Sequence, residues 1–246
     1  MSASAAVLKS EARLFSREPG SLFWIVAFPS VLLAILGLIP TFRTADPGLD
    51  GLRVIDLYVP IVVLLAIVVA GVQAMPPVLT GYRELGILRR MSTTPVRPAS
   101  LLTAQIVLHA AASVCSAVIA MAVGRLVYGV ALPAQLFGYA LALVLAALAA
   151  LAAGATIAAL SRTTKISTAI GSAVLFPSMF TLGVWLPVQA MPDALQRVVL
   201  LTPFGAASQA LNEAAAGDWP SWSHLGVTAL WIVILVGAAA RWFRWE

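Results

Sequence analysis

Long runs of uncharged, mostly apolar residues recur along this sequence, and they restrict its fold more than any other feature. An α-helix needs about 20 apolar residues to cross the hydrocarbon core of a bilayer. Only 10% of the 246 residues are charged, whereas soluble proteins carry about 25%. The runs therefore predict an all-α, polytopic membrane protein, in which one transmembrane domain of six spans occupies residues 1–246.

The six expected spans are separated by polar turns or by proline and glycine. We place them at residues 21–40, 56–80, 101–124, 134–160, 166–186 and 224–240. The fourth is rich in alanine, and small residues let helices approach one another closely in lipid.

A charged segment precedes the first span. Leu8, Ala12 and Phe15 recur there at helical spacing, which predicts an N-terminal amphipathic helix on the membrane surface. A cleaved signal peptide is the competing interpretation. No small-residue cleavage site follows the first apolar run, so we favour an uncleaved first span.

Lysine and arginine are distributed unequally between the two sides of such a six-span chain. Eleven of the 15 lie on the side that carries both termini, and four lie in the opposite loops. Because positive residues concentrate in cytoplasmic loops, both termini are expected in the cytoplasm. The formal net charge of +5 would also suit a nucleic acid. We expect no such partner, since the basic residues stand at the ends of apolar runs.

Residues able to carry out catalysis are scarce. A P-loop for ATP needs a lysine directly after a glycine, and the two lysines, Lys9 and Lys165, follow leucine and threonine. The two histidines lie in different segments and Cys115 is the single cysteine, so clustered metal ligands are not expected either. We therefore predict no catalytic residue, no metal and no cofactor in this chain.

His109 is the one ionisable residue expected deep within a span. Intramembrane ionisable residues often mark ion or proton pathways, so a proton-coupled secondary carrier is one open interpretation. A neutral histidine bonded to a neighbouring helix is the simpler one. A non-transporting membrane scaffold is a further alternative that the sequence leaves open.

A charged island, residues 81–98, separates the second and third spans. Four of its residues recur every three positions, which predicts one face of a short amphipathic helix beside the membrane. Pro95 and Pro98 should end that helix. Gly86 is expected where a partner comes close, because glycine otherwise weakens a helix by about 1 kcal/mol. The predicted face is Tyr82, Leu85, Leu88 and Met91, and the charged residues are Arg83, Glu84, Arg89 and Arg90.

The order of residues in this island resembles the first cytoplasmic loop of permeases of the ABC-2 transporter family. The matching positions are Arg83-Glu84, Gly86, Ile87-Leu88, Thr94-Pro95 and Pro98. In that family the loop is a coupling helix that docks on a separate ATPase subunit. The resemblance implies a coupling site formed by Tyr82, Arg83, Glu84, Leu85, Gly86, Leu88, Arg89 and Met91.

A second stretch, residues 182–219, is similar to the outer end of the same family. It contains Gly-Val-Trp-Leu-Pro from Gly183, Met-Pro-Asp-Ala-Leu-Gln from Met191, and Thr-Pro-Phe-Gly from Thr202. Phe204-Gly205 departs from the family pattern, which more often has leucine or tryptophan before a small polar residue. The resemblance implies short re-entrant helices in the outer leaflet and an exit region formed by Gly183, Pro187, Pro192, Pro203 and Phe204.

Over the whole chain, the resemblance is to small exporters of the daunorubicin-resistance type. It implies a multi-pass subunit of a bacterial inner (cell) membrane that pairs with a second copy or with a related permease. ATP and Mg²⁺ would be bound by separate ABC ATPase subunits. The few aromatic and charged residues of the spans suit a hydrophobic or amphipathic substrate, such as a drug, an antibiotic or a lipid-like molecule.

Overall fold

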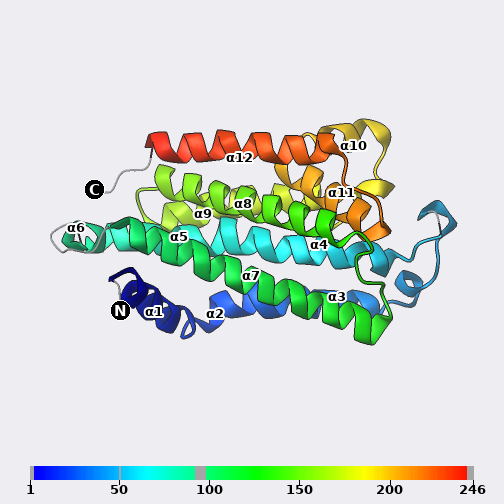
Figure 1. Ribbon diagram of the computed structural model, residues 1–246, viewed down its shortest axis with the longest axis horizontal. Helices are drawn as coiled ribbons and strands as arrows, with labels where there is room; N and C mark the ends of the chain where they lie inside the picture. Colours follow the sequence, from blue (N-terminus) through cyan, green and yellow to red (C-terminus); the bar gives the residue numbers. More distant parts are fainter. Residues whose placement is uncertain (1–2, 50, 92–97, 243–246) are drawn as a thin grey trace.

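The computed structural model describes residues 3–49, 51–91 and 98–242, and its helices form one elongated bundle (Figure 1). Within those ranges, six helices are long and apolar enough to cross a bilayer. They are Pro19–Gly37, Val54–Glu84, Ser100–Tyr128, Leu136–Leu160, Thr164–Leu182 and Trp222–Trp242. The predicted all-α, six-span membrane architecture is confirmed.

The spans run nearly parallel, and the segments that connect them collect at two opposite ends of the bundle (Figure 1). The α6 end carries α1 (Ala3–Phe15), α6 (Ile87–Met91) and the last turn of α12 (Trp222–Trp242). The α10 end carries the short helices η2 (Pro40–Arg43), η3 (Pro47–Leu49), η5 (Val188–Ala190) and α10 (Asp193–Leu200).

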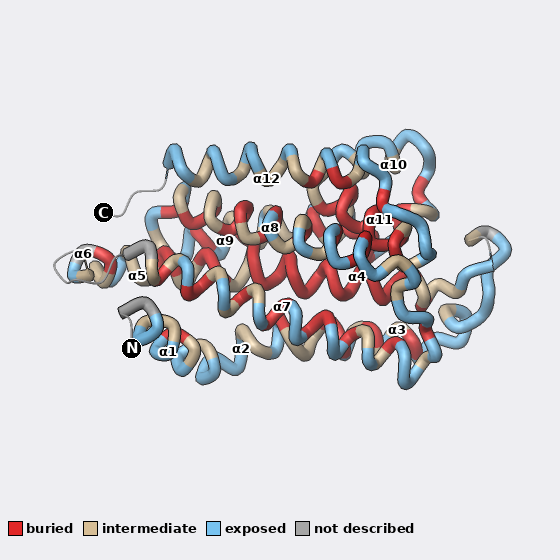
Figure 2. The backbone as a smooth tube through the Cα atoms, viewed as in Figure 1, coloured by how far each residue is buried: buried red, intermediate tan, exposed pale blue. Residues whose placement is uncertain are grey.

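The second span is the centre of the bundle. In its first helix, α4 (Val54–Val68), nearly every side chain is buried whichever way it points (Figure 2). A helix that is apolar on all sides must be covered on all sides. Around it pack α3 (Phe28–Gly37), α7 (Pro98–Tyr128), α8 (Leu136–Leu160), α9 (Thr164–Leu182) and α11 (Pro203–Ala216).

Two spans contain a widened, π-helical turn shortly before a proline. In chain order the first span is α2 (Pro19–Leu22), η1 (Phe23–Ala27) and α3, and the second is α4, η4 (Val69–Ala74) and α5 (Met75–Glu84). Pro29 follows η1, and Pro76 follows η4. Proline has no N–H, and its ring presses on the carbonyl four residues earlier. Both of those carbonyls lie within the π-helical turns, which accommodate the prolines without ending the helix.

Several span boundaries differ from the predicted ones for identifiable reasons. The third span continues to Tyr128 instead of ending at residue 124, because its last turn packs on the first span. There the Tyr128 hydroxyl donates to the Ala34 carbonyl at 2.6 Å, and the phenol ring fills the place of a side chain at Gly37, where the first span ends. The fifth span stops at Leu182, not at 186, since Gly183 takes a left-handed conformation with φ of 92°.

α8 and η4 lie backbone against backbone. A Cβ atom on Gly154 would lie 1.9 Å from the carbonyl oxygen of Gly71, and one on Gly71 would lie 2.5 Å from the carbonyl carbon of Ala150. Atoms cannot approach that closely, so both positions require glycine. The alanine-rich fourth span therefore packs directly on the central span, in agreement with its small residues.

Gly154→Leu should destabilise the bundle, because a side chain there must push α8 away from η4, at a cost of about 3 kcal/mol. Gly237→Leu in α12 is the matched control, since a Cβ atom there meets nothing within 4 Å. Thermal unfolding of both variants in one detergent measures the difference. Equal melting temperatures would contradict the close approach of the two helices.

Candidate functional site

The island between the second and third spans is not one helix over Tyr82–Met91, as its residue spacing predicts. α5 ends at Glu84, a turn follows, and α6 begins at Ile87. Gly86 in the turn has a φ of 67°, and its N–H donates to the Arg83 carbonyl at 2.9 Å. This left-handed residue ends α5 and turns the chain into α6.

The turn changes the interpretation of the apolar residues. Leu85 is 69% exposed whereas Leu88 is only 4% exposed, so the predicted common face of Leu85, Leu88 and Met91 is not formed. A Cβ atom on Gly86 would meet nothing within 4 Å. Gly86 is therefore required for its backbone conformation, and the expectation that it lies inside a helix is wrong.

Part of the predicted pattern falls outside the described structure. Thr94, Pro95 and the side chain of Arg89 belong to this part. Pro98 is the first residue of α7, where a missing N–H is harmless.

Arg83, near the end of α5, reaches the junction between the fourth and fifth spans. Its half-buried guanidinium donates through Nη1 to the carbonyl oxygens of Ala158 at 3.1 Å and Ser161 at 3.0 Å. These carbonyls end α8, where the last turn has no N–H partners within the helix and carries partial negative charge. A cation is therefore favourable at this position.

Glu84 binds the start of the next helix. Its Oε2 accepts from the Thr164 backbone N–H at 3.0 Å and from the Thr164 hydroxyl at 2.7 Å. Thr164 opens α9, and the N-terminus of a helix favours a carboxylate. Arg83 thus binds the C-terminal end of α8, and the adjacent Glu84 binds the N-terminal end of α9. We call these four hydrogen bonds the Arg83–Glu84 brace.

The predicted coupling residues are therefore divided among three places. Arg83 and Glu84 meet the α8–α9 junction, and the Tyr82 hydroxyl donates to Glu11 of α1 at 2.7 Å. The remaining residues belong to the turn and to α6, which lies at the tip of the bundle (Figure 1).

The five exit-region residues mostly shape the backbone at the α10 end. Pro187 and Pro192 stand directly before η5 and α10, and Pro203 is the first residue of α11. A Cβ atom on Gly183 would come within 3.3 Å of the Pro187 Cα, so these two are brought together. Phe204 is buried in the main hydrophobic core.

The unusual Phe204-Gly205 pair has a packing explanation. Phe204 fills the core beside α4 and α8, and a Cβ atom on Gly205 would lie 2.2 Å from the Val199 carbonyl oxygen. Gly205 therefore allows α11 to fold back tightly on α10.

A cavity of about 600 Å³ opens between the two π-helical turns and α9. Drug-sized ligands occupy pockets of about 300–1,000 Å³. Its wall includes the aromatic residues Trp24, Phe28 and Phe176 together with Gln73. π-Helical turns recur at functional sites, and both of those in the described chain border this cavity.

The cavity wall contains one polar contact. The Gln73 Nε2 donates to the Ser172 hydroxyl at 3.2 Å, and within the described residues the buried Gln73 Oε1 has no hydrogen-bond partner. This cavity was not predicted from the sequence, because its residues come from three spans. Gln73, a lone amide in a strongly apolar run, was the only available signal.

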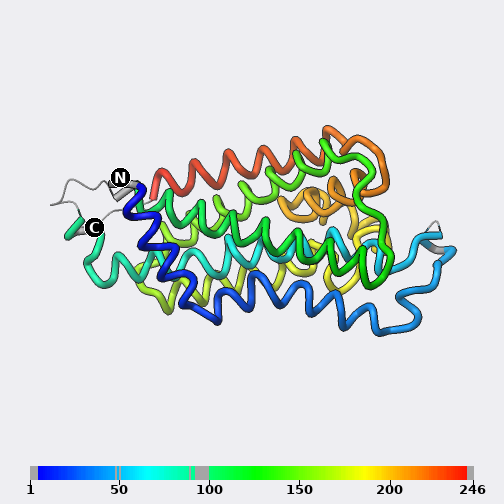
Figure 3. The backbone as a smooth tube through the Cα atoms, turned by 60° about the horizontal axis from the view of Figure 1, so that its bottom comes forward, coloured from blue at the N-terminus to red at the C-terminus, as the bar shows by residue number. Residues whose placement is uncertain are grey.

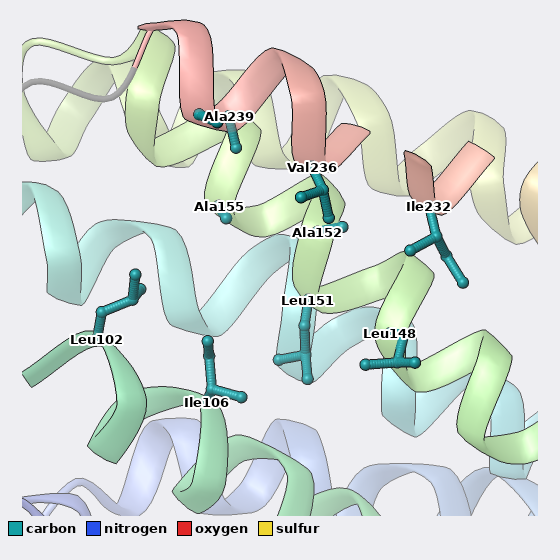
Figure 4. Close-up of a pocket in the computed structure, with 10 residues that line it drawn as sticks. Leu102, Ile106, Leu148, Leu151, Ala152, Ala155, Ile232, Val236 and Ala239 are labelled. Atoms are coloured by element: carbon teal, nitrogen blue, oxygen red, sulfur yellow. The ribbon is translucent and has the colours of Figure 1, made fainter. Parts of the chain in front are cut away.

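A second cleft, of about 450 Å³, lies between α7, α8 and α12 (Figure 4). Leu102 and Ile106 of α7 face Ile232 and Val236 of α12 across Leu151 of α8. All the residues that line it are leucine, isoleucine, valine or alanine. It can hold hydrocarbon, but it offers no polar side chain with which to select a ligand.

His109 is buried, as expected, but its contacts differ from the predicted bond to a neighbouring helix. Its Nδ1 lies 2.9 Å from the Gln105 carbonyl oxygen, one turn earlier in the same helix. The ring packs edge-on against Phe15 of α1, with centroids 5.2 Å apart. His224 lies at the other end of the bundle, with Nδ1 3.0 Å from Glu213 Oε1.

A profile of the ABC-2 type transporter family matches residues 3–214, which include five of the six spans, the brace and the cavity. No individually curated protein matches the chain. The matched segment is far more than half of the sequence, and it contains both stretches whose residue order resembles that family. The chain therefore belongs to the ABC-2 type transporter family, as the membrane-embedded permease component of an ABC transporter.

Proposed function

We propose that this permease is the membrane subunit of an ATP-driven exporter, and that a separate subunit binds ATP and Mg²⁺ and docks at the α6 end. The observation that carries this proposal is the Arg83–Glu84 brace. It joins the inner end of the second span to the ends of the fourth and fifth. A displacement applied at α6 would therefore reach three spans at once.

The cavity between η1, η4 and α9 is the proposed place of the substrate. Its aromatic and aliphatic wall suits a hydrophobic body, and Gln73 places one amide group in that wall. A hydrophobic or amphipathic drug, antibiotic or lipid-like molecule fits that chemistry. The cavity is open at the surface of a single chain, so a second permease copy, or a related one, would complete it. The contacts of His109, a backbone carbonyl and a phenyl ring, do not support the proton-coupled alternative.

The first test concerns coupling. The purified chain alone should hydrolyse no ATP, and a complex with its ATPase should show hydrolysis and export together. Arg83→Ala should lower export about tenfold while leaving basal hydrolysis, because a lost charge-assisted bond of about 1.5 kcal/mol corresponds to that factor. Glu84→Ala should lower export in the same direction but by less, because Glu84 is exposed. Arg162→Ala, an exposed cation of the same junction, is the control. Normal export by both brace variants at normal abundance would refute the mechanical role.

The second test concerns orientation. The excess of basic residues at the α6 end supports a cytoplasmic position for that end. In a Cys115→Ala background, cysteines at Pro47 and Asp218 should label from outside intact cells. A cysteine at Arg162 should label only after permeabilisation. External labelling at Arg162 would reverse the orientation and remove the docking site from the side where ATP is found.

The third test concerns the substrate. Phe176→Ala should raise the KM for export about tenfold, because burying an aromatic side chain against a ligand contributes about 1.5–3 kcal/mol. Gln73→Leu should favour more apolar substrates, because it removes the amide from the cavity wall. Phe137→Ala is the matched control, since that ring is 82% exposed at the α10 end and lies outside the cavity. Unchanged KM values in both cavity variants would move the substrate elsewhere.

A further inference from the structure

Glu11 is a buried acidic residue on a helix that otherwise lies at the edge of the molecule. It is 7% exposed, whereas Lys9, Ser10 and Arg13 on the same helix are exposed. Acidic side chains are rarely buried unless they are paired, because removal from water penalises an unsatisfied carboxyl group. The partners of Glu11 therefore indicate which elements α1 is attached to.

One oxygen of Glu11 connects three elements that are far apart in sequence. Its Oε2 accepts from the Tyr82 hydroxyl of α5 at 2.7 Å and from the Gln105 Nε2 of α7 at 2.6 Å. Both distances are short, as expected for hydrogen bonds to a carboxylate. A single side chain thus fastens α1 to the ends of the second and third spans.

A second contact fixes the same arrangement one helical turn away. Phe15 of α1 packs on His109 of α7, just as Glu11 bonds Gln105. Both pairs are spaced by four residues on each helix, so they lie on one face of α1 and one face of α7. Figure 3 shows α1 crossing the end of the bundle obliquely beside these helices.

Tyr82 links the Glu11 contact to the Arg83–Glu84 brace. It immediately precedes the two residues of the Arg83–Glu84 brace. The last turn of α5 is therefore held on one side by α1 and on the other by the α8–α9 junction. If either attachment were lost, the last turn of α5, which leads to Gly86 and α6, would be held on one side only.

We propose that Glu11 is a positioning residue, which through Tyr82 fixes the position of the turn at Gly86 and of α6. By this contact, α1 holds α6 in place relative to the membrane surface. This inference rests on the proposed function, because it assumes that an ATPase docks at α6. In this proposal Glu11 acts only through its acceptor oxygen and transfers no proton. A glutamine at this position keeps an acceptor oxygen, so it should preserve the contacts with Tyr82 and Gln105.

The experiment measures molecules exported per ATP hydrolysed by the permease–ATPase complex. Glu11→Ala and Tyr82→Phe should each lower that ratio several-fold, and the double variant should be no worse than Glu11→Ala alone, because the alanine already removes the Tyr82–Glu11 bond. Glu11→Gln should keep most of the ratio. Arg13→Ala, exposed on the same helix, is the control. A merely structural defect would lower abundance and hydrolysis with export, leaving the ratio unchanged.

A second measurement needs neither ATP nor substrate. Leu8 of α1 and Ala104 of α7 line one small pocket, so cysteines at these positions in a Cys115→Ala background should cross-link with a short bifunctional reagent. Glu11→Ala should reduce that cross-linking, and Glu11→Gln should not. If the parent chain fails to bind an ATPase, the proposed function fails, while this readout still reports on α1.

Three results would overturn the inference. One is an unchanged export ratio in both Glu11→Ala and Tyr82→Phe. Another is unchanged cross-linking in Glu11→Ala. The third is a Glu11→Gln variant as impaired as Glu11→Ala, which would mean that the charge or the proton of Glu11 matters instead of its acceptor geometry.

Discussion

Hydrogen bonding of the backbone inside hydrocarbon is the constraint on which the rest of this structure depends. The central span interrupts the regular helical hydrogen bonding at Pro76, which leaves the Val72 carbonyl without its helical partner. That oxygen faces α9 where a Cβ atom on Gly171 would lie 2.8 Å away, so glycine lets a Cα–H group approach it instead. Gly154 likewise lets α8 approach the Gly71 carbonyl oxygen of η4. The irregular turn that borders the cavity is thus stabilised by glycines of its neighbours.

The same constraint explains the arginines at the two ends of the central span. Arg53, just before α4, pairs with Asp56 at 2.6 Å and donates to the Tyr128 carbonyl, which ends α7. This pairing raises the pKa of Arg53 above its ordinary value. Arg83 at the opposite end serves the last carbonyls of α8 in the same way. Each arginine satisfies the exposed end of a different span, so the central span is fixed to two neighbours by its own termini.

The sequence predicts the spans well because bilayer thickness imposes a length and a composition that can be counted. It fails at residues whose state depends on distant partners. Gly86 fits a helical spacing equally well inside a helix or at its end, and only the φ angle distinguishes them. Glu11 looks like a solvated charge until Tyr82 and Gln105 supply two donors. The cavity could not be predicted either, because Trp24, Gln73 and Phe176 meet only after three spans have packed.

The cavity and the Arg83–Glu84 brace are connected by continuous helix, because η4 runs directly into α5. Gln73 in the cavity wall and Glu84 in the brace are separated by eleven residues, or about 16 Å along a helix. Tyr82, Arg83 and Glu84 hold the α6 end of that helix, while the π-helical turn η4 is its least regular point. If an ATPase docks at the α6 end, as proposed, a rotation imposed there would act on η4, where the amide of Gln73 lies. Under that proposal, the irregular turn at the cavity is also the place where movement of α5 would reach a bound substrate.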